Sequence, residues 1–408
     1  MLTALLALAL AADPKPEFPL FIAQGTEPTS VGGTLAKLTP DFGVTLVEPN
    51  ATIQAGELVS LRRARKPLPP LPSTSHVRLA NGDVIRVTEV IGDGDTSITL
   101  AARFGSAKDS VPLIIPLTAL SAVWFTDPPA DTPPDPAAYS WFDATKKQDA
   151  LLLRNGDIVR GAVDKFTGDQ TGVVRFKPAG EKTPTSYPRS AVAAVAFDPS
   201  LARVKKPKGA FARVTTSDGS RLSVSAVSAD DKTLDATPLT GGKVSLPLAD
   251  LMAVDVLGGK AAYLSDLKPK AVKEEAFGSV AWPWAADRSV KGNSLRLRTP
   301  LGDEVFSKGL GLHSKTTLTY DLGGKYRWFE ASVGLDPVSG RRGAVDITIL
   351  VDGKPQATDG LTGLTFAAGV KAVAVDVKKA KELTIVVDYG PGGDVQDDVT
   401  FADARFVE

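Results

Sequence analysis

The sequence predicts an all-β protein in which several small β-barrels precede a β-sandwich. Two observations predict the barrels. Thirty Pro and 37 Gly interrupt the 408 residues, which favours short strands, and one layout of such strands recurs before residue 260. A third observation predicts the sandwich, because apolar and polar residues then alternate with period two in one segment after another.

The N-terminus carries an apolar run from Leu2 to Ala12, broken only by Thr3. A bilayer span needs roughly 20 residues, so this run is too short to cross a membrane. It ends in small residues, as the cleavage site of a secretory signal does, although no Lys or Arg precedes it. We expect a signal peptide over 1–12 and a secreted, periplasmic or cell-envelope protein. An apolar N-terminus that packs or stays unstructured is the alternative.

Charge and cysteine content exclude several functions. Lys and Arg number 47 and Asp and Glu number 47, so the formal net charge is zero. A neutral chain offers a polyanion little attraction, and no nucleic-acid partner is expected. The chain has no Cys, which excludes disulfides, thiolate catalysis and zinc–thiolate sites.

Three segments share the recurring layout, and we expect small β-barrels over 76–126, 149–198 and 210–258. Each opens with an apolar strand and a turn at Asn-Gly or Asp-Gly, which predicts a two-residue hairpin. The turns are Asn81-Gly82, Asn155-Gly156 and Asp218-Gly219, and the matching closing strands are Pro116–Phe125, Pro188–Phe197 and Pro247–Val256. A degenerate fourth copy precedes them over 18–64.

Each unit has room for about five short strands, which is enough to close a small barrel. The bent hairpin and the final strand resemble SH3-like and Sm-like barrels. Sm proteins bind RNA, but the neutral charge argues against that function here. The barrels are therefore expected to act as spacers or protein-contact modules with unidentified protein partners. Pro-rich connections such as 65–75 and 127–138 are expected to be stiff spacers between them.

Beyond Lys260 the strands alternate cleanly. Apolar residues occupy every second position over 345–351, 373–377 and 383–387, as in antiparallel strands with one buried face. Six to eight such strands predict a β-sandwich over 262–408.

This region resembles a known family. The stretches "SVKGNSLRLRTPLGDEVFSKGLGLHSKTTLTYDLGGKYRWFEASVGLD", "DITILVDGK", "KELTIVVDYG" and "FADARF" are similar to the NPCBM domain, a carbohydrate-binding module found beside family 98 glycoside hydrolases. The resemblance implies a jelly-roll-like sandwich that binds galactose-type glycans through loops at one edge.

His313 lies in the "FSKGLGLHSK" core of this resemblance. Gly309 and Gly311 would let the backbone approach a neighbouring strand closely. A histidine beside such a turn is more often a hydrogen-bonded structural residue, and sugar binding is the second interpretation. No serine, cysteine or carboxylate pattern accompanies it, which argues against catalysis.

A sugar site needs an aromatic face and planar polar groups. Three loops supply such residues, and one of the two tryptophans is expected to cap the core instead. The candidate sugar-binding residues are Trp282, Trp284, Asp287, Arg288, His313, Arg341, Asp397 and Asp398.

The chain departs from the family at one motif. The family reads Asp-His-Ala-Asp-Trp-Ala-Asp-Ala where this chain has residues 397–404. Asp398, Thr400 and Phe401 replace the family's His, second Asp and Trp. The departure puts the glycan specificity in question. The acidic loops also carry oxygen ligands of the kind Ca²⁺ takes, but no EF-hand pattern is present and no cofactor is predicted.

Three functions compete. The first is a secreted, non-catalytic carbohydrate-binding protein, and the second is a cell-envelope structural protein that has lost the sugar site. The third is an accessory subunit or hidden catalytic unit of a glycoside hydrolase. Hydrolysis needs two carboxylates across a cleft, for which the small barrels have little room. The first function is therefore favoured, and no enzymatic activity is expected.

Overall fold

The computed structural model describes residues 20–92, 96–129, 132–168, 172–204, 207–278, 280 and 282–408, and the expected signal peptide lies outside them. The described chain is almost entirely β, which confirms the predicted fold class. Its helical segments are short 3-10 turns, and none of its helices is long and apolar enough to span a bilayer. The turns are η1 (Leu117–Ala119), η2 (Pro136–Ala138), η3 (Ala144–Lys146), η4 (Arg189–Ala191), η5 (Pro199–Leu201), η6 (Leu248–Asp250), η7 (Leu264–Asp266) and η8 (Phe366–Ala368).

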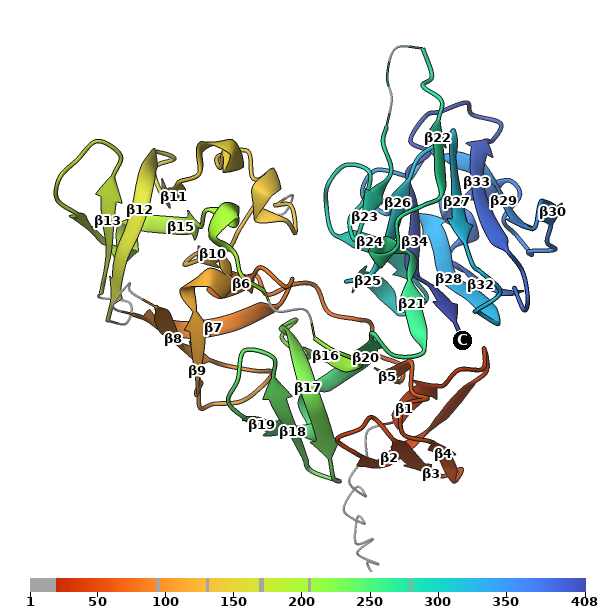
Figure 1. Cartoon of the computed structure of the whole chain (residues 1–408), viewed down its shortest axis with the longest axis horizontal. Helices are drawn as coiled ribbons and strands as arrows, with labels where there is room; N and C mark the ends of the chain where they lie inside the picture. Colours follow the sequence, from red (N-terminus) through yellow and green to blue (C-terminus); the bar gives the residue numbers. More distant parts are fainter. Residues whose placement is uncertain are drawn as a thin grey trace, which may run out of the picture.

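Four successive repeats share one five-stranded arrangement (Figure 1). In each, the first four strands pair with their neighbours in chain order, and the fifth pairs back with the first. Repeat 1 has β1 (Leu20–Gln24), β2 (Ser30–Leu38), β3 (Val44–Val47), β4 (Ala51–Ile53) and β5 (Ser60–Arg63). Repeat 2 has β6 (His76–Leu79), β7 (Val84–Ile91), β8 (Ser97–Ala102), β9 (Val111–Pro116) and β10 (Leu120–Trp124). Repeat 3 has β11 (Asp149–Leu153), β12 (Ile158–Thr167), β13 (Val173–Pro178), β14 (Thr185–Pro188) and β15 (Val192–Ala196). Repeat 4 has β16 (Phe211–Thr216), β17 (Arg221–Ala229), β18 (Thr233–Pro238), β19 (Val244–Pro247) and β20 (Leu251–Leu257).

A β-bulge bends the second strand of every repeat. The register shifts by one residue between Leu35 and Lys37 in β2, and at the matching positions of β7, β12 and β17. Each shift lies next to the point where the strand passes from its first partner to its second. Because a bulge increases the local bend and twist, the five strands curl round an apolar interior.

The Asn-Gly and Asp-Gly turns are longer than the two-residue hairpins expected from the sequence. In repeat 2 the Leu79 amide donates to the Asp83 carbonyl at 2.9 Å, and the Gly82 amide donates back to the Leu79 carbonyl. Three residues therefore separate the last bonded pair, and only the glycine, with φ of 86°, has a positive φ. The same pattern recurs at Gly156 and Gly219, so these are three-residue loops with a glycine bulge.

The repeats join through their closing strands. β5 pairs antiparallel with β20, and β10 pairs antiparallel with β15, so repeats 1 and 4 form one pair and repeats 2 and 3 another. Figure 1 shows the four repeats along an arc. The Pro-rich connections pack against the repeats instead of standing free as spacers. Carbonyls of Pro69 and Pro70 accept from Arg221, and Tyr139 packs against Trp124.

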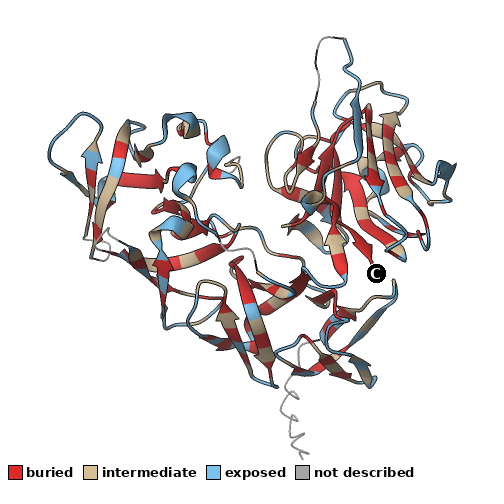
Figure 2. Ribbon diagram, viewed as in Figure 1, coloured by how far each residue is buried: buried red, intermediate tan, exposed pale blue. Residues whose placement is uncertain are grey.

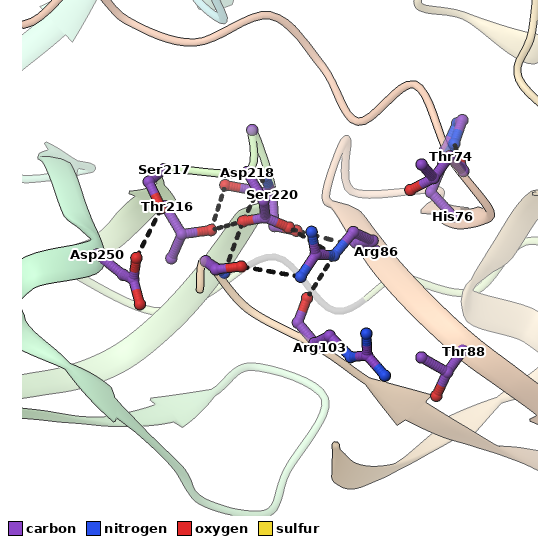
Figure 3. Close-up of polar contacts among 12 residues, drawn as sticks. Thr74, His76, Arg86, Thr88, Arg103, Thr216, Ser217, Asp218, Ser220 and Asp250 are labelled. Carbon is purple, nitrogen blue, oxygen red and sulfur yellow. Dashed lines mark hydrogen bonds and ion pairs between the residues drawn. The ribbon is translucent and has the colours of Figure 1, made fainter. Parts of the chain in front are cut away.

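The turn of repeat 4 also holds repeat 2 in place, as Figure 3 shows. Asp218 accepts from its own repeat through the Ser220 hydroxyl at 2.8 Å, and from repeat 2 through the Gly105 amide at 2.9 Å. The Arg86 guanidinium lies 3.4 Å from the same carboxylate. A Cβ at position 105 would lie 2.2 Å from the Asp250 side chain, so the two repeats touch where only glycine fits.

His76 is a buried base in repeat 2 (Figure 3) and gives a pH prediction. Burial, together with nearby Arg78, lowers its pKa from 6.5 to about 3, and its Nδ1 contacts the Thr74 carbonyl at 2.8 Å. Between these two pKa values the unfolded chain binds a proton that the folded chain does not. The free energy of unfolding should therefore fall with decreasing pH by about 1.4 kcal/mol per unit in this window.

We expect His76→Gln to remove this contribution. Urea unfolding of the wild type and of His76→Gln, measured from pH 7 to 4, should give a difference in stability that narrows as the pH falls. Buried carboxylates act equally in both proteins and cancel in the difference. A difference independent of pH would show that His76 does not titrate in this way.

The C-terminal region is a sandwich of two sheets, as predicted, with a small hairpin beside them. Buried residues fill the space between the sheets (Figure 2), including the alternating Ile347, Ile349, Leu383, Ile385 and Val387. One sheet holds β21 (Ala261–Tyr263), β23 (Ala285–Ala286), β26 (Gly309–Leu312), β28 (Trp328–Leu335), β32 (Lys371–Asp376) and β34 (Val399–Val407). The other holds β22 (Ala271–Glu274), β27 (Thr316–Asp321), β29 (Ala344–Val351), β30 (Lys354–Pro355), β31 (Leu364–Thr365) and β33 (Glu382–Tyr389). The hairpin is β24 (Leu295–Thr299) and β25 (Gly302–Phe306).

Buried polar contacts join the sandwich to repeat 1. The carboxylate of Glu330 in β28 accepts from the Arg405 side chain of β34 at 3.1 Å. It also accepts from the side-chain amide of Gln24 in β1 at 2.7 Å. Arg62 of β5 lies 2.9 Å from Asp403. These contacts cross the boundary between the sandwich and repeat 1, so the two regions pack against each other.

Candidate functional site

Strand register brings three loops together at one end of the sandwich. β26 and β28 both end opposite Val399, the first residue of β34. The residues immediately outside these three strand ends, His313, Asp336 and Asp398, therefore lie side by side. The Asp336 amide donates to the Asp398 carbonyl at 2.9 Å, which fixes the arrangement.

Asp398 is a buried carboxylate with no hydrogen-bond partner among the residues that the structure describes. Its residue is 2% exposed, and neither Oδ1 nor Oδ2 accepts a hydrogen bond. The Nε2 atom of His313 lies 3.7 Å from Oδ1, and the Nζ atom of Lys291 lies 3.9 Å from Oδ2. The hydroxyl of Thr400, fully buried two residues further on, also lacks a partner. Buried polar atoms are nearly always paired, so this cluster can accept hydrogen bonds from another molecule.

The two tryptophans of the 282–288 loop do different things. Trp284 packs against the sandwich core, which is the capping role expected for one of them. Trp282 is half-buried, and its ring lies 5.8 Å from the His313 ring, centroid to centroid. The Lys291 ammonium lies over the Trp282 ring, 3.0 Å from its centroid. An aromatic face therefore stands beside the unpartnered carboxylate.

His313 combines a structural contact with a place at the site. It is 3% exposed, and its Nδ1–H donates to the Ser314 carbonyl at 2.6 Å. Nε2 is then left facing Asp398. A hydroxyl that donates to Asp398 would give this carboxylate a partner. Both interpretations made from the sequence are thus compatible with the position of His313.

Two other acidic residues of these loops, Asp397 and Asp336, are engaged internally. Asp397 accepts from the Ser314 hydroxyl at 2.6 Å and from the Ala344 amide at 3.1 Å. Asp336 accepts from the amides of Val338 and Ser339. Burial raises the pKa of both carboxyls. These two side chains hold the loops together, whereas the buried Asp398 carboxylate is left without a hydrogen-bond donor among the described residues.

Three predicted site residues lie elsewhere. Asp287 pairs with Lys308 at 2.6 Å, and Arg288 faces Asp135 of the repeat region at 3.9 Å. Both line a cleft toward the repeats. Arg341 donates to the Pro337 carbonyl within its own loop.

Comparisons with known proteins identify the family of the C-terminal region. The family model of the NPCBM/NEW2 domain matches residues 260–407. The sandwich is an NPCBM/NEW2 domain. The resemblance stated from the sequence is therefore confirmed.

The individual proteins that are similar to this chain match only part of it. "Putative endo-alpha-N-acetylgalactosaminidase" of Renibacterium salmoninarum is 25% identical over 148 residues, which are 36% of this chain and 10% of that protein. The chain thus spans a tenth of that relative. Two solved Clostridium perfringens structures are also similar, each with a TM-score of 0.33. CBM51 from GH95 in complex with methyl-galactose is 26% identical and covers 36% of this chain and 99% of that one. The structure of CBM51-2 and INT domains of ZmpB, in complex with GlcNAc, is 28% identical. Its match covers 43% of this chain and 36% of that one.

Within the NPCBM domain, the unpartnered side chains stand at two of the positions that depart from the family pattern. Asp398 and Thr400 replace the family's His and second Asp, and both have polar atoms without partners. Thr400 could therefore have been noticed from the sequence. Lys291 carried no such signal, because only the fold brings its turn against Trp282. In the described part of the chain, no three His, Cys, Asp or Glu side chains gather as a metal site would require.

Gly311 explains part of the motif around His313. A Cβ at this position would lie 2.5 Å from the Arg288 carbonyl, and one at Gly309 would lie 2.3 Å from the Phe401 carbonyl. A backbone atom cannot move aside as the end of a flexible side chain can. We therefore expect Gly311→Ala to lower the free energy of unfolding by about 2 to 3 kcal/mol. Urea unfolding checks this, with Gly353→Ala as a control. Its Cβ would meet nothing within 4 Å, although its φ of 76° carries a cost of its own. A Gly311→Ala loss no larger than the control's would refute the packing argument.

Proposed function

We propose that the NPCBM domain binds a neutral, galactose-type sugar without catalysing a reaction, at the site between Trp282 and Asp398. The observation that carries the proposal is the buried Asp398 carboxylate, which has two unpartnered oxygens beside an aromatic ring. A pyranose supplies what both lack, because its hydroxyls donate hydrogen bonds and its apolar face stacks on an indole.

Lys291 controls access to this site. Its ammonium lies over the Trp282 ring and next to Asp398, so a stacked sugar must displace it. The side chain is about one-third exposed and stands on a short turn closed by the Gly292 amide and the Ser289 carbonyl. It can therefore swing aside and then donate to a sugar oxygen. Thr400 and His313 offer further partners to the hydroxyls that enter.

Two facts support a galactose-type ligand. The family that the domain belongs to is one of carbohydrate-binding modules, and the curated relative's name refers to an N-acetylgalactosamine glycoside. The repeats then serve to present the domain. The apolar run of residues 2–12 leads us to propose export as well. N-terminal sequencing of the protein from its own cells tests export, and an intact Met1 in a cytosolic fraction would argue against it.

A glycan array probed with the full-length protein tests the binding function, followed by NMR titration with the best ligand. We expect neutral galactosides to bind with a Kd on the order of 0.1 to 1 mM, typical of a shallow site that stacks one ring. Asp398→Asn should weaken binding, because the amide replaces one acceptor with a donor. If no glycan binds the wild type, a scaffold role in the cell envelope takes the place of sugar binding.

A further inference from the structure

A second cavity lies between the repeats and the NPCBM domain. Its volume is about 940 Å³, and its walls come from repeats 2 and 4, from the two connections around Pro134 and Pro207, and from the sandwich segment before β24 and strand β25. In Figure 1 repeats 2 and 4 face the sandwich on the concave side of the arc. This volume is at the upper end of the range for small-molecule sites.

The sandwich wall of this cleft is electrically balanced. Lys308 pairs with Asp266 at 2.7 Å and with Asp287 at 2.6 Å. Arg288 faces Asp135 at 3.9 Å, and its side chain is 41% exposed. The charges on this wall largely cancel.

The repeat wall is not balanced. Arg78 of β6 and Arg221 of β17 line the cleft and are at least nine-tenths buried, yet neither takes part in an ion pair among the described residues. Arg78 donates to the Pro134 carbonyl at 2.8 Å, and its buried Nε has no partner in the described part of the chain. Arg221 donates only to carbonyls, including those of Pro69 and Val305.

Arg213 of β16 adds a third cation to this wall. Its Nε has no hydrogen-bond partner among the described residues and lies 4.0 Å from an Asp83 oxygen, while its Nη2 donates to the Asn81 carbonyl at 3.2 Å. Burial, and after it the neighbouring Arg213, lowers the pKa of Arg221, although the carboxylates of Asp255 and Asp218 act in the opposite direction. Buried guanidinium groups are normally matched by carboxylates or phosphates, with which they form paired hydrogen bonds.

The remaining lining suits a sugar. Phe211, Leu257 and Phe306 give apolar surface, and Ser121 and Ser307 also line the cleft. Strands β6 and β16 are paired on both sides, so neither offers a free edge to an added peptide strand. We propose that this cleft binds a short acidic oligosaccharide whose carboxylates pair with Arg78 and Arg213. The choice of a sugar rests on the proposed function of the NPCBM domain, whereas the negative charge of the ligand does not.

Calorimetric titration of the full-length protein with trigalacturonate, and with galactotriose as its neutral counterpart, tests this proposal. We expect trigalacturonate to bind about tenfold more tightly than galactotriose, and to lose most of that advantage between about 50 and about 500 mM NaCl, because screening weakens ion pairs. Arg213→Gln should remove the advantage. Arg288→Gln, which changes a side chain that is 41% exposed, should reduce it about threefold. Arg154→Gln, on an exposed turn of repeat 3, is the matched control and should change nothing.

The outcomes separate the two sites. Trp282→Ala should leave trigalacturonate binding intact even if it abolishes neutral-sugar binding, so failure of one proposal does not imply failure of the other. Equal binding of the charged and neutral trisaccharides, or unchanged binding in both folded Arg variants, would overturn the cleft proposal. Competition by pentaglutamate as strong as that by trigalacturonate would overturn its assignment to a sugar.

Discussion

Replacing Trp282 with alanine is expected to abolish measurable binding of a neutral sugar to the NPCBM domain. The ring is the aromatic surface beside the unpartnered Asp398 carboxylate, and stacking supplies much of the affinity of a site this weak. A loss of about 1.4 kcal/mol would raise a millimolar Kd tenfold, beyond what titration detects. Because Trp282 is only half-buried, the free energy of unfolding should change by less than about 1 kcal/mol. NMR titration and urea unfolding of the same variant measure both quantities.

Trp284→Ala is the matched control, since it removes the same side chain two residues away. Trp284 packs against the sandwich core, so we expect a loss of stability on the order of 2 kcal/mol with sugar binding retained in the folded fraction. The reverse result, with binding lost in Trp284→Ala and kept in Trp282→Ala, would place the sugar on the other face of the loop. It would contradict the site described above.

The sequence predicted the strands well because burial of one face leaves a local signature. Positions 345–349 and 383–387 alternate in the sequence and are alternately buried in the sandwich. The turns were predicted less well. Asn81-Gly82 indicates a hairpin, but the Leu79–Asp83 pair that sets its length depends on how the strands meet. The same holds for the Pro-rich connections, whose carbonyls are held by an arginine about 150 residues away.

The candidate site was predicted only in part, because its residues are brought together by the fold and not by the local sequence. His313 and Asp398 are 85 positions apart, and the family pattern rather than local sequence pointed to both. Asp287 and Arg288 are polar residues on the expected loop, but the chain turns there and directs them to the cleft beside the repeats. Sequence alone cannot tell which face of a loop a side chain occupies, because that depends on the strand register of its neighbours.

Arg405→Met should destabilise the NPCBM domain by about 3 to 5 kcal/mol, the cost of leaving a buried charge without its partner. Arg405 and Glu330 are 5% and 6% exposed, and the Glu330 carboxylate also accepts from Gln24 of repeat 1. Methionine keeps the length and apolar stem of the arginine but not its charge. Hydrogen exchange of peptides from β28 and β34 measures the local effect, and protection there should fall by about two orders of magnitude or more.

The double variant Arg405→Met with Glu330→Met tests whether the single variant loses stability because Glu330 is left as an unpaired buried charge. A buried ion pair contributes little beyond an apolar replacement, so removing both charges should restore most of the protection lost in the single variant. The contact between Gln24 and the sandwich would still be lost, because its partners at Glu330 and Arg405 are gone. We therefore expect exchange in β1 to stay fast in the double variant while β28 and β34 recover. Wild-type protection in the Arg405→Met single variant would show that water reaches Glu330 and that the pair is not buried. Recovery of β1 together with β28 would show that repeat 1 is held on the sandwich by other contacts, such as that between Arg62 and Asp403.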